Sequence, residues 1–264
     1  MSHKQKLRSI DVRDVYHQEY FLQRVDGHDQ FARFDGTPQT LFDRARRNLE
    51  LLDVHSGEYF LDLGCGRGEV AIAAGFLGAV AFGCDFSYDA IMLAKQKLMS
   101  IKRSSGREIQ TSFLCAVATD DIFRSNVFDK VLMSEFIEHI SPYERKIVLE
   151  NVRKWLKPSG KLLIYTYPNR WSRHTYPLMR WYVRWRTGID IGVRPDDTLH
   201  PDYAKLHLNE QSYLSLYVAL WRAGFRQIRV WFDSPTPSGR LRIIKLSLLY
   251  NVLFGGNLTA LGVK

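Results

Sequence analysis

The sequence predicts an α/β fold with a doubly wound, mostly parallel sheet of seven strands and helices on both faces. Three observations lead to this prediction. The segment Tyr59–Leu63 is a short apolar strand that runs into a glycine-rich turn and then into an alanine-rich helix, Glu69–Phe76. A second apolar segment, Val80–Asp85, follows that helix. Further strands then alternate with helices, which is typical of a parallel sheet covered by its crossover helices.

The segment before the first strand, residues 1–52, is polar and rich in aromatic residues. Within it, Thr37 followed by Pro38 predicts the start of a helix, because threonine is a good N-cap and proline fits the first helical turn. We expect this helix to continue to about Leu52.

The later elements are predicted from hydrophobic periodicity and from turn residues. The expected helices run from Ser87 as N-cap to about Met99, from Pro142 to Leu156, and from Glu210 to Ala223. The expected strands are Ile109–Cys115, Asp129–Ser134, Lys161–Thr166, Gln227–Phe232 and Leu258–Lys264. Residues 157–160 (KPSG) are expected to separate the second of these helices from the strand at Lys161.

Residues 168–205 form an inserted aromatic and basic segment after the fifth strand, with arginines placed among Trp171, Trp181 and Trp185. Part of it is expected to be helical, with a loop at Asp196–Tyr203. Such a segment fits a membrane interface, an RNA surface or a substrate lid. The alternative is an insertion helix that buries its tryptophan face. The apolar segment Ile243–Phe254 is too short to span a bilayer and is expected to cover the sheet or to dip into an interface.

The composition fits a globular protein and gives a hint about its partners. The chain has 264 residues, 45% of them hydrophobic, which suits one large domain or one domain with an added lobe. Its formal charge of +9 favours an anionic partner, either nucleic acid, a phosphorylated substrate or a membrane surface. A basic charge without any such partner is equally compatible with the sequence.

The N-terminal sequence and the cysteines favour a cytoplasmic protein, with a peripheral membrane location as the alternative. The N-terminus lacks the apolar segment of a signal peptide, and no run of about 18 apolar residues predicts a membrane span. The three cysteines are odd in number and lack zinc-type spacing, which favours reduced thiols over disulfides.

The glycine turn predicts a ligand site. Gly64, Gly66 and Gly68 suit a turn with positive φ in which a ligand approaches the backbone, and the following helix directs its N-terminal N–H groups to the same place. Asp85, at the tip of the second strand, can accept hydrogen bonds from both hydroxyls of a ribose. Asp62, two residues before the first glycine, suits a cationic group such as the ammonium of an amino acid.

The run FLDLGCGRGE followed by GCDFSYDAIMLA resembles motif I and its continuation in class I S-adenosylmethionine-dependent methyltransferases. The resemblance covers Leu51–Trp171 well and Leu206–Phe232 more loosely. The run KPSGKLLIYTYPN resembles the stretch between the fourth helix and the fifth strand of that family. The resemblance implies a Rossmann-like methyltransferase fold that closes with an antiparallel hairpin, and S-adenosylmethionine as the cofactor.

The resemblance also implies roles for individual residues. Gly64, Cys65 and Gly66 would cradle the methionine part of the cofactor, while Asp62 would support this loop or contact the ammonium. Asp85 would bind the ribose hydroxyls, with Phe86 beside the adenine. Family members often carry an acid and a small residue after the third strand; here Val117 and Ala118 stand there, so the adenine contact is expected from the backbone N–H of Ala118.

The N-terminal segment of such enzymes often covers the cofactor as a lid. Tyr16, Tyr20 and Phe34 are therefore candidates to cover the sulfonium. Packing on the edge of the sheet is the alternative for each of them.

A second group of polar residues, Glu135-Phe-Ile-Glu-His139, follows the fourth strand. If a helical turn starts there, Glu135, Glu138 and His139 share one face at the carboxyl end of the sheet. They can hold a divalent ion or provide His139 as a base, with a purely structural role as the third interpretation. The motif resembles metal-assisted small-RNA 2′-O-methyltransferases and ubiquinone-pathway O-methyltransferases, whose further downstream histidine would be His207. No metal ligand is assigned; these four residues are the candidates.

We therefore expect an enzyme that methylates an oxygen or nitrogen atom of a small or lipid-linked metabolite, with His139, Glu135 and His207 as catalytic residues and Glu135 also near the cofactor. The alternatives are a metal-assisted RNA 2′-O-methyltransferase, a catalytically silent cofactor-binding protein and a nicotinamide dehydrogenase. We expect one domain with four regions: an N-terminal lid at 1–52, a cofactor-binding core at 53–167, an insertion at 168–205 and a C-terminal region at 206–264.

Overall fold

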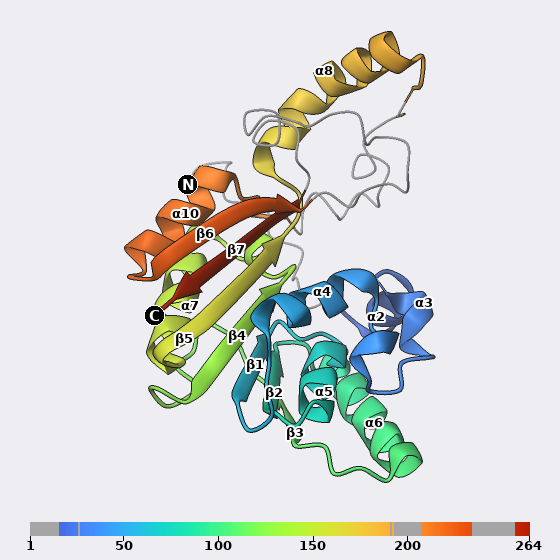
Figure 1. Cartoon of the computed structure of the whole chain (residues 1–264), viewed down its shortest axis with the longest axis vertical. Helices are drawn as coiled ribbons and strands as arrows, with labels where there is room; N and C mark the ends of the chain where they lie inside the picture. The colour runs from blue at the N-terminus through green and yellow to red at the C-terminus, as the bar shows by residue number, and fades with distance from the viewer. Residues whose placement is uncertain (1–15, 26, 191, 193–206, 234–256) are drawn as a thin grey trace, which may run out of the picture. The chain divides into compact units, whose positions relative to one another are not determined.

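The computed structural model describes residues 16–25, 27–190, 192, 207–233 and 257–264 (Figure 1). The predicted loop at Asp196–Tyr203 and the apolar segment Ile243–Phe254 lie outside these residues. The chain divides into two compact units, Met1–Ile122 and Phe123–Lys264. The predicted four-region organisation of one domain remains a prediction.

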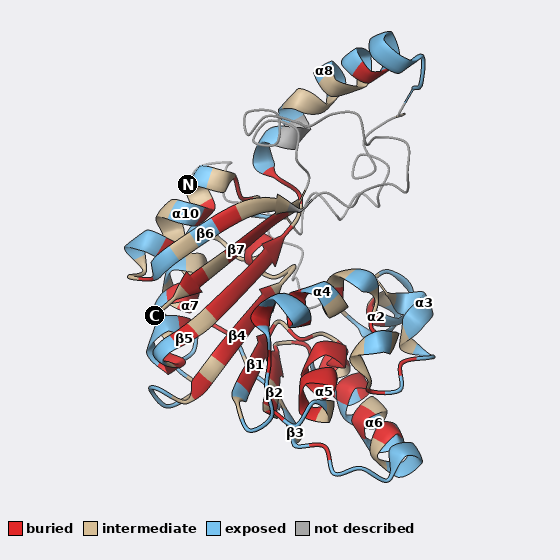
Figure 2. Ribbon diagram, in the orientation of Figure 1, coloured by how far each residue is buried: buried red, intermediate tan, exposed pale blue. Residues whose placement is uncertain are grey.

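The first unit is built on three parallel strands, with β2 (Val80–Asp85) between β1 (Tyr59–Leu63) and β3 (Thr111–Cys115). Helix α5 (Glu69–Phe76) packs on all three strands, and α6 (Tyr88–Ser105) packs on β2 and β3. The first seven residues of α5 are all buried, which explains why its sequence is apolar on every side (Figure 2). In the described residues before β1 there are four short elements: α2 (Gln18–Gln23), α3 (His28–Phe31), the 3₁₀ helix η2 (Pro38–Thr40) and α4 (Asp43–Leu52).

The predicted helix from Thr37 to Leu52 is wrong in its first part. Only the 3₁₀ helix η2 follows Thr37, the backbone is then extended at Leu41 and Phe42, and α4 begins at Asp43. The reason is a side-chain turn: one carboxylate oxygen of Asp35 accepts hydrogen bonds from the Thr37 N–H (2.8 Å) and from the hydroxyls of Thr37 and Thr40 (2.7 Å each). These bonds favour a tight turn over a continuous helix.

Helix α6 begins as predicted and ends later. The Ser87 hydroxyl accepts a hydrogen bond from the Ala90 N–H and so caps the helix. The helix continues past Met99 to Ser105 because Ile101 is still buried against the unit, and it ends at Gly106, whose φ of 64° is the left-handed conformation of a C-terminal glycine.

The second unit is built on four strands in the order β4-β5-β7-β6. Strands β4 (Phe128–Ser134) and β5 (Leu156–Thr166) are parallel, while β7 (Asn257–Val263) is antiparallel to both β5 and β6 (Arg226–Asp233). The helices in its described residues are α7 (Pro142–Trp155), α8 (Arg170–Thr187) and α10 (Tyr213–Arg222), with the 3₁₀ helix η3 (Ile137–His139) after β4.

Strand β5 starts earlier than predicted. Leu156 already pairs with Phe128, whereas Lys161 pairs with Lys130, so the register shifts between these two pairs. Residues 157–160, expected as a separate turn, are instead an irregularity within the strand, in the manner of a β-bulge.

The predicted class of fold is confirmed. The described residues contain the seven expected strands, the pairs of β1, β2 and β3 and of β4 and β5 are parallel, and the expected antiparallel hairpin closes the second unit. Part of the insertion is helical, as expected, because α8 lies within it. No helix in the described part of the chain is both long and apolar enough to cross a membrane.

Candidate functional site

The glycine turn between β1 and α5 has the conformation that its sequence predicts. Gly64, Gly66 and Gly68 have φ angles of 81°, 50° and 79°, which L-residues rarely adopt. A Cβ atom at Gly68 would lie 2.5 Å from the Phe113 ring and 2.8 Å from Ala94, so this position also lacks space. At Gly66 the nearest atom to such a Cβ would be 3.7 Å away, so the backbone there can be approached by a ligand.

Asp85 lies directly beside this turn. Its Oδ2 accepts a hydrogen bond from the Gly66 N–H at 2.9 Å, and its Oδ1 accepts one from the Ser87 N–H at 2.9 Å. The carboxylate therefore ties the tip of β2 to the turn and to the start of α6. A carboxylate has about four acceptor sites, so a group of this kind can accept hydrogen bonds from ribose hydroxyls as well as from backbone N–H groups.

Asp62 is a buried carboxyl group in the same unit. It lies on β1 with 3% of its surface exposed. Burial, together with the nearby charges of Asp85 and Glu69, raises the pKa of Asp62 to about 8. A ligand cation placed next to this carboxyl group would favour its ionised form, so the site suits an ammonium or sulfonium group.

The residues expected near an adenine lie at the same ends of β2 and β3. The Ala116 N–H donates to the Asp85 carbonyl at 3.0 Å, which places Val117 and Ala118 directly after that contact. The Phe86 ring is met edge-on by Tyr16, with ring centroids 5.3 Å apart. The contact of Phe86 and Ala118 with an adenine stays a prediction.

The cysteines of the turn region are not activated thiols. Burial raises the pKa of Cys84 to about 12, and it raises that of Cys65 well above the ordinary value. Both thiols therefore remain protonated at neutral pH. Cys65, Cys84 and Cys115 are all free, as the sequence predicts.

The N-terminal segment packs over this part of the first unit. The Ser87 hydroxyl donates to the Tyr16 carbonyl at 2.9 Å, and the Gln18 N–H donates to Asp89 at 2.9 Å. Tyr16 and Tyr20 pack against a cluster formed by Phe21, Ala90 and Leu93. Phe34 is buried, which fits its packing interpretation, whereas Tyr16 lies against Phe86 and remains a candidate lid residue.

Sequence reasoning missed Arg67, the residue between two glycines of the turn. Its side chain is buried and forms two 3.1 Å contacts to the carboxylate of Glu69. Its Nη1 also donates to the Phe21 carbonyl at 2.9 Å, and its guanidinium lies over the Phe31 ring at 4.6 Å. Arg67 thus connects the glycine turn to α2 and α3. The only signal in the sequence was an arginine two residues before a glutamate inside a turn.

In the second unit, the group Glu135–His139 does not form the expected α-helical face. Glu135 has a φ of 50°, and the turn that follows is the 3₁₀ helix η3, which begins only at Ile137. Glu138 is buried, and its carboxylate accepts hydrogen bonds from the Thr166 hydroxyl (2.9 Å) and the Tyr167 N–H (3.5 Å). Its role in this arrangement is to hold η3 against the end of β5.

His139 and His207 come together as the sequence suggests. Their ring centroids are 4.8 Å apart, with the planes at 78°. The Asn209 N–H donates to the Glu138 carbonyl at 3.0 Å and so fixes the segment of His207 beside η3. Among the described residues, no group of three His, Cys, Asp or Glu side chains is arranged to hold a metal ion.

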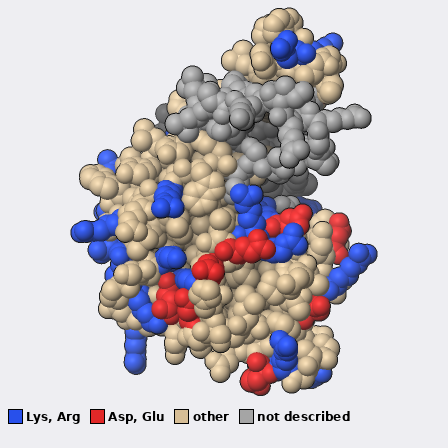
Figure 3. All heavy atoms as spheres, viewed as in Figure 1, with Lys and Arg blue, Asp and Glu red and all other residues tan. Residues whose placement is uncertain are grey.

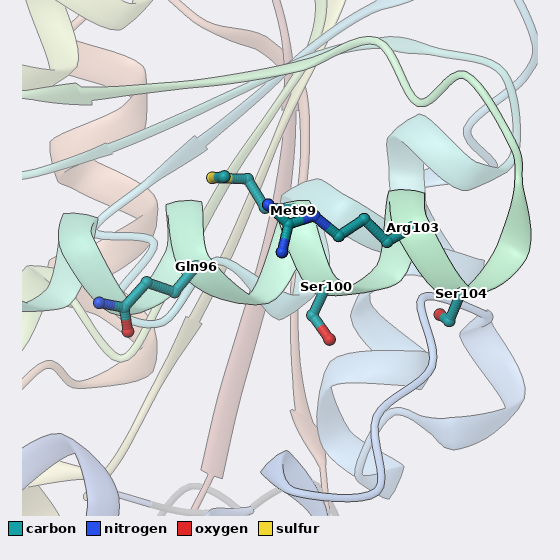
Figure 4. A pocket seen from close by; sticks show the side chains of 5 residues that line it. All are labelled: Gln96, Met99, Ser100, Arg103 and Ser104. Atoms are coloured by element: carbon teal, nitrogen blue, oxygen red, sulfur yellow. The ribbon is translucent and has the colours of Figure 1, made fainter.

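A hollow of about 450 Å³ lies on α6 in the first unit (Figure 4). It is lined by Gln96, Met99, Ser100, Arg103 and Ser104. These residues belong to the C-terminal half of α6, whereas Asp85 and Ser87 stand at the other end of the helix. The hollow contains no acid–base pair, and we assign no function to it.

Comparison with known proteins points to one family. A family model described as "Methyltransferase domain" matches residues 61–164. Phosphoethanolamine N-methyltransferase 1 of Triticum aestivum is 30% identical over 128 residues, which are 48% of this chain and 24% of that protein. The Ubiquinone biosynthesis O-methyltransferase of Nitrobacter winogradskyi is 28% identical over 178 residues, which are 65% of this chain and 64% of that protein. The match thus spans less than two thirds of the length of either relative.

Solved structures share the fold. Phosphoethanolamine N-methyltransferase 2 of Haemonchus contortus, in complex with S-adenosyl-L-methionine, has a TM-score of 0.59 and 18% identity over 97% of this chain and 60% of that chain. A putative methyltransferase in complex with the Haloferax volcanii Trm112 methyltransferase activator has a TM-score of 0.58 and 18% identity over 93% of this chain and 96% of that chain. At this identity the likeness concerns the fold.

Proposed function

We propose that the protein is a class I S-adenosylmethionine-dependent methyltransferase that transfers a methyl group from S-adenosylmethionine to an oxygen or nitrogen atom of a small or lipid-linked metabolite; the match of residues 61–164 to a methyltransferase domain supports this. The observation that carries this proposal is the glycine turn with Asp62 and Asp85 beside it. The names of the two relatives, one an N-methyltransferase and one an O-methyltransferase of small metabolites, support the acceptor class.

The residues of the first unit fit this cofactor. When bound, S-adenosylmethionine would supply an electrophilic methyl group on a sulfonium, whose sulfur leaves as a neutral thioether. Asp62 offers a buried carboxyl group whose ionised form the ammonium would favour, and Asp85 offers acceptors to the ribose hydroxyls. Gly66 lets the ligand approach the backbone, while Phe86 and the backbone of Ala118 are proposed to contact the adenine.

The second unit supplies the proposed base. The new bond to the methyl carbon forms as the carbon–sulfur bond breaks, so a hydroxyl or ammonium acceptor must also lose a proton. We propose that His139 accepts this proton. Its side chain is partly exposed and lies against His207. Glu138 positions η3 through Thr166 and Tyr167, and Glu135 is proposed as a further polar group of the acceptor side.

The metal-assisted RNA alternative has no supporting observation in the described residues. It would require Glu138 as a ligand, and that carboxylate is engaged with the end of β5. We therefore assign no metal ligand, and we do not propose the RNA reaction.

Calorimetric titration with S-adenosylhomocysteine tests the proposal. We expect micromolar binding that is lost in Asp85→Ala and retained in Asp43→Ala, a control that removes a well-exposed carboxylate. A thermal melt of each variant shows whether it is folded. Absence of binding to the wild-type protein would contradict the cofactor assignment, and unchanged affinity in Asp85→Ala would contradict the role of that residue.

The same protein with methyl-labelled donor then tests the acceptor class. Phosphoethanolamine and a hydroxylated intermediate of ubiquinone biosynthesis represent the acceptors that the relatives' names suggest. Label in either product supports the proposed class. Label transferred only to RNA would overturn it.

A further inference from the structure

Helix α8 carries a set of large apolar side chains that are not buried within its unit. The exposed fractions are 49% for Trp171, 63% for Leu178, 65% for Trp181, 39% for Tyr182 and 68% for Trp185. These five residues are called the tryptophan face below. Of the described side chains of α8, only Val183 is buried, and Figure 2 shows the helix mostly in the colours of exposed and intermediate residues.

The members of the tryptophan face lie along one side of the helix. Leu178, Tyr182 and Trp185 follow Trp171 by 7, 11 and 14 residues, which are close to whole numbers of helical turns. Trp181 lies beside them, and its ring stacks on that of Trp185, with centroids 6.2 Å apart and planes 6° apart. The face is therefore a continuous aromatic surface. Surfaces of this kind mark interaction sites.

All charged side chains of helix α8 are positive. The sequence of α8 contains five arginines and no Asp or Glu. Figure 3 shows Lys and Arg side chains on this helix. Asp190, just past the helix, pairs with Arg180 at 2.6 Å and lies 3.7 Å from Arg184, so it offsets one of the five charges.

We propose that the tryptophan face of α8 docks onto the surface of a bilayer that contains anionic lipids. Tryptophan and tyrosine prefer the interface between headgroups and acyl chains, because each ring has an apolar body and a polar N–H or O–H. Arg170 and Arg186, near the two ends of the face, meet the negative charge of the headgroups. The helix lies in the plane of the interface in this proposal and does not cross the membrane, which agrees with its charge.

A bilayer fits this surface better than single-stranded RNA does. An RNA-binding surface needs separated aromatic rings whose faces are open to bases. Here the rings of Trp181 and Trp185 lie parallel with centroids only 6.2 Å apart, and Leu178, the third most exposed member of the tryptophan face, offers only aliphatic surface. The proposal goes beyond methyl transfer and does not depend on it.

Co-sedimentation of the full chain with lipid vesicles tests the proposal. The vesicles are phosphatidylcholine alone, or phosphatidylcholine with about 30% phosphatidylglycerol, at about 0.1 M and about 0.5 M salt. We expect binding to the anionic vesicles that weakens at high salt. The double variant Trp181→Ala/Trp185→Ala should bind at least about tenfold more weakly. Trp221→Ala, which removes a tryptophan of 63% exposure from α10, is the matched control and should bind as the wild type does.

A second variant tests the proposal independently, in case the tryptophan variant does not fold. Arg170→Gln/Arg186→Gln removes two charges of the helix and keeps all its aromatic residues; it should lose most of the binding at low salt and approach the wild type at high salt. Failure of the wild-type chain to bind anionic vesicles overturns the proposal. Equal binding of the tryptophan variant and the Trp221→Ala control also overturns it, as does loss of vesicle binding in the presence of a short single-stranded RNA that binds with higher affinity.

Discussion

Asp62 is a carboxyl group that the fold buries before any ligand is present. The pKa of Asp62 is raised from 3.8 to about 8 by burial and by the charges of Asp85 and Glu69. Between these two pH values the native protein holds a proton that the unfolded chain has released. The free energy of unfolding therefore falls as the pH rises through this window, and the contribution of this group levels off above it.

The variant Asp62→Asn tests this charge. An amide keeps the shape of the side chain without a charge to bury, so we expect the melting temperature of the variant to exceed that of the wild type by more at pH 9 than at pH 6. The wild type should bind S-adenosylhomocysteine more tightly at pH 8 than at pH 6, and the variant should lose this increase. Asp43→Asn, on the surface, is the control for both measurements. A melting difference that does not change with pH would show that Asp62 is not the titrating group.

Arg67 is the residue through which the turn holds the N-terminal segment. Arg67→Met would leave Glu69 buried without its closest partner, and we expect a loss of about 3–5 kcal/mol in the free energy of unfolding, measured with urea. Arg67→Met/Glu69→Gln should recover part of this loss because no buried charge remains. The matched control is Arg46→Met, which breaks an exposed 2.7 Å pair with Asp43 and should cost only about 0–1 kcal/mol. Similar losses in both single variants would contradict a buried ion pair at Arg67.

At the scale of elements, the segment from β1 to β2 could be predicted to the residue. Each of its boundaries has a local cause: an apolar run, a glycine with positive φ, or an acid at a strand tip. Where the boundary of an element depends on distant contacts or on side-chain contacts, the predicted boundary differs from the observed one. Helix α4 starts late because Asp35 forms a turn with Thr37 and Thr40, and β5 starts early because Leu156 pairs with Phe128. Neither contact leaves a periodic signal in the sequence.

The start of α5 provides a test at this scale. Gly68→Ala must place a Cβ in the left-handed region and also 2.5 Å from the Phe113 ring, whereas Gly57→Ala has a similar φ of 81° and no atom within 4 Å. We expect both variants to lose about 1–2 kcal/mol from the backbone conformation, and Gly68→Ala to lose a further 1–3 kcal/mol or so from overpacking. Urea unfolding of the two variants measures the difference. Equal losses would mean that the Phe113 ring moves aside at no cost.

At the scale of the whole molecule, what could be predicted of the site depends on how far apart in the chain its residues lie. Asp62, the glycines and Asp85 fall within one strand–turn–helix–strand segment, and their contacts are local. The pair of His139 and His207 was suggested by a family resemblance, since no local pattern joins residues so far apart. The contact between Arg67 and the Phe21 carbonyl bridges 46 residues and had no such resemblance to indicate it. The contacts of Glu138 with Thr166 and Tyr167 could not be predicted, because these partners lie 28 and 29 residues away in the chain.

The division of the chain into two compact units implies that cofactor binding and proton removal can be separated by mutation. The turn with Asp62 and Asp85 belongs to the first unit, and His139 belongs to the second. In His139→Ala, S-adenosylhomocysteine at about 100 times its dissociation constant should still stabilise the protein by about 2.7 kcal/mol, as in the wild type.

Turnover of the same variant should fall by roughly two orders of magnitude or more if His139 accepts the proton of the acceptor. His55→Ala, which removes a well-exposed histidine, is the control and should retain both properties. Thermal melts with and without ligand and transfer of labelled methyl measure the two quantities on one preparation. A variant that keeps wild-type turnover would remove His139 from the mechanism. One that loses ligand stabilisation as well would show that the residue supports cofactor binding rather than proton transfer alone.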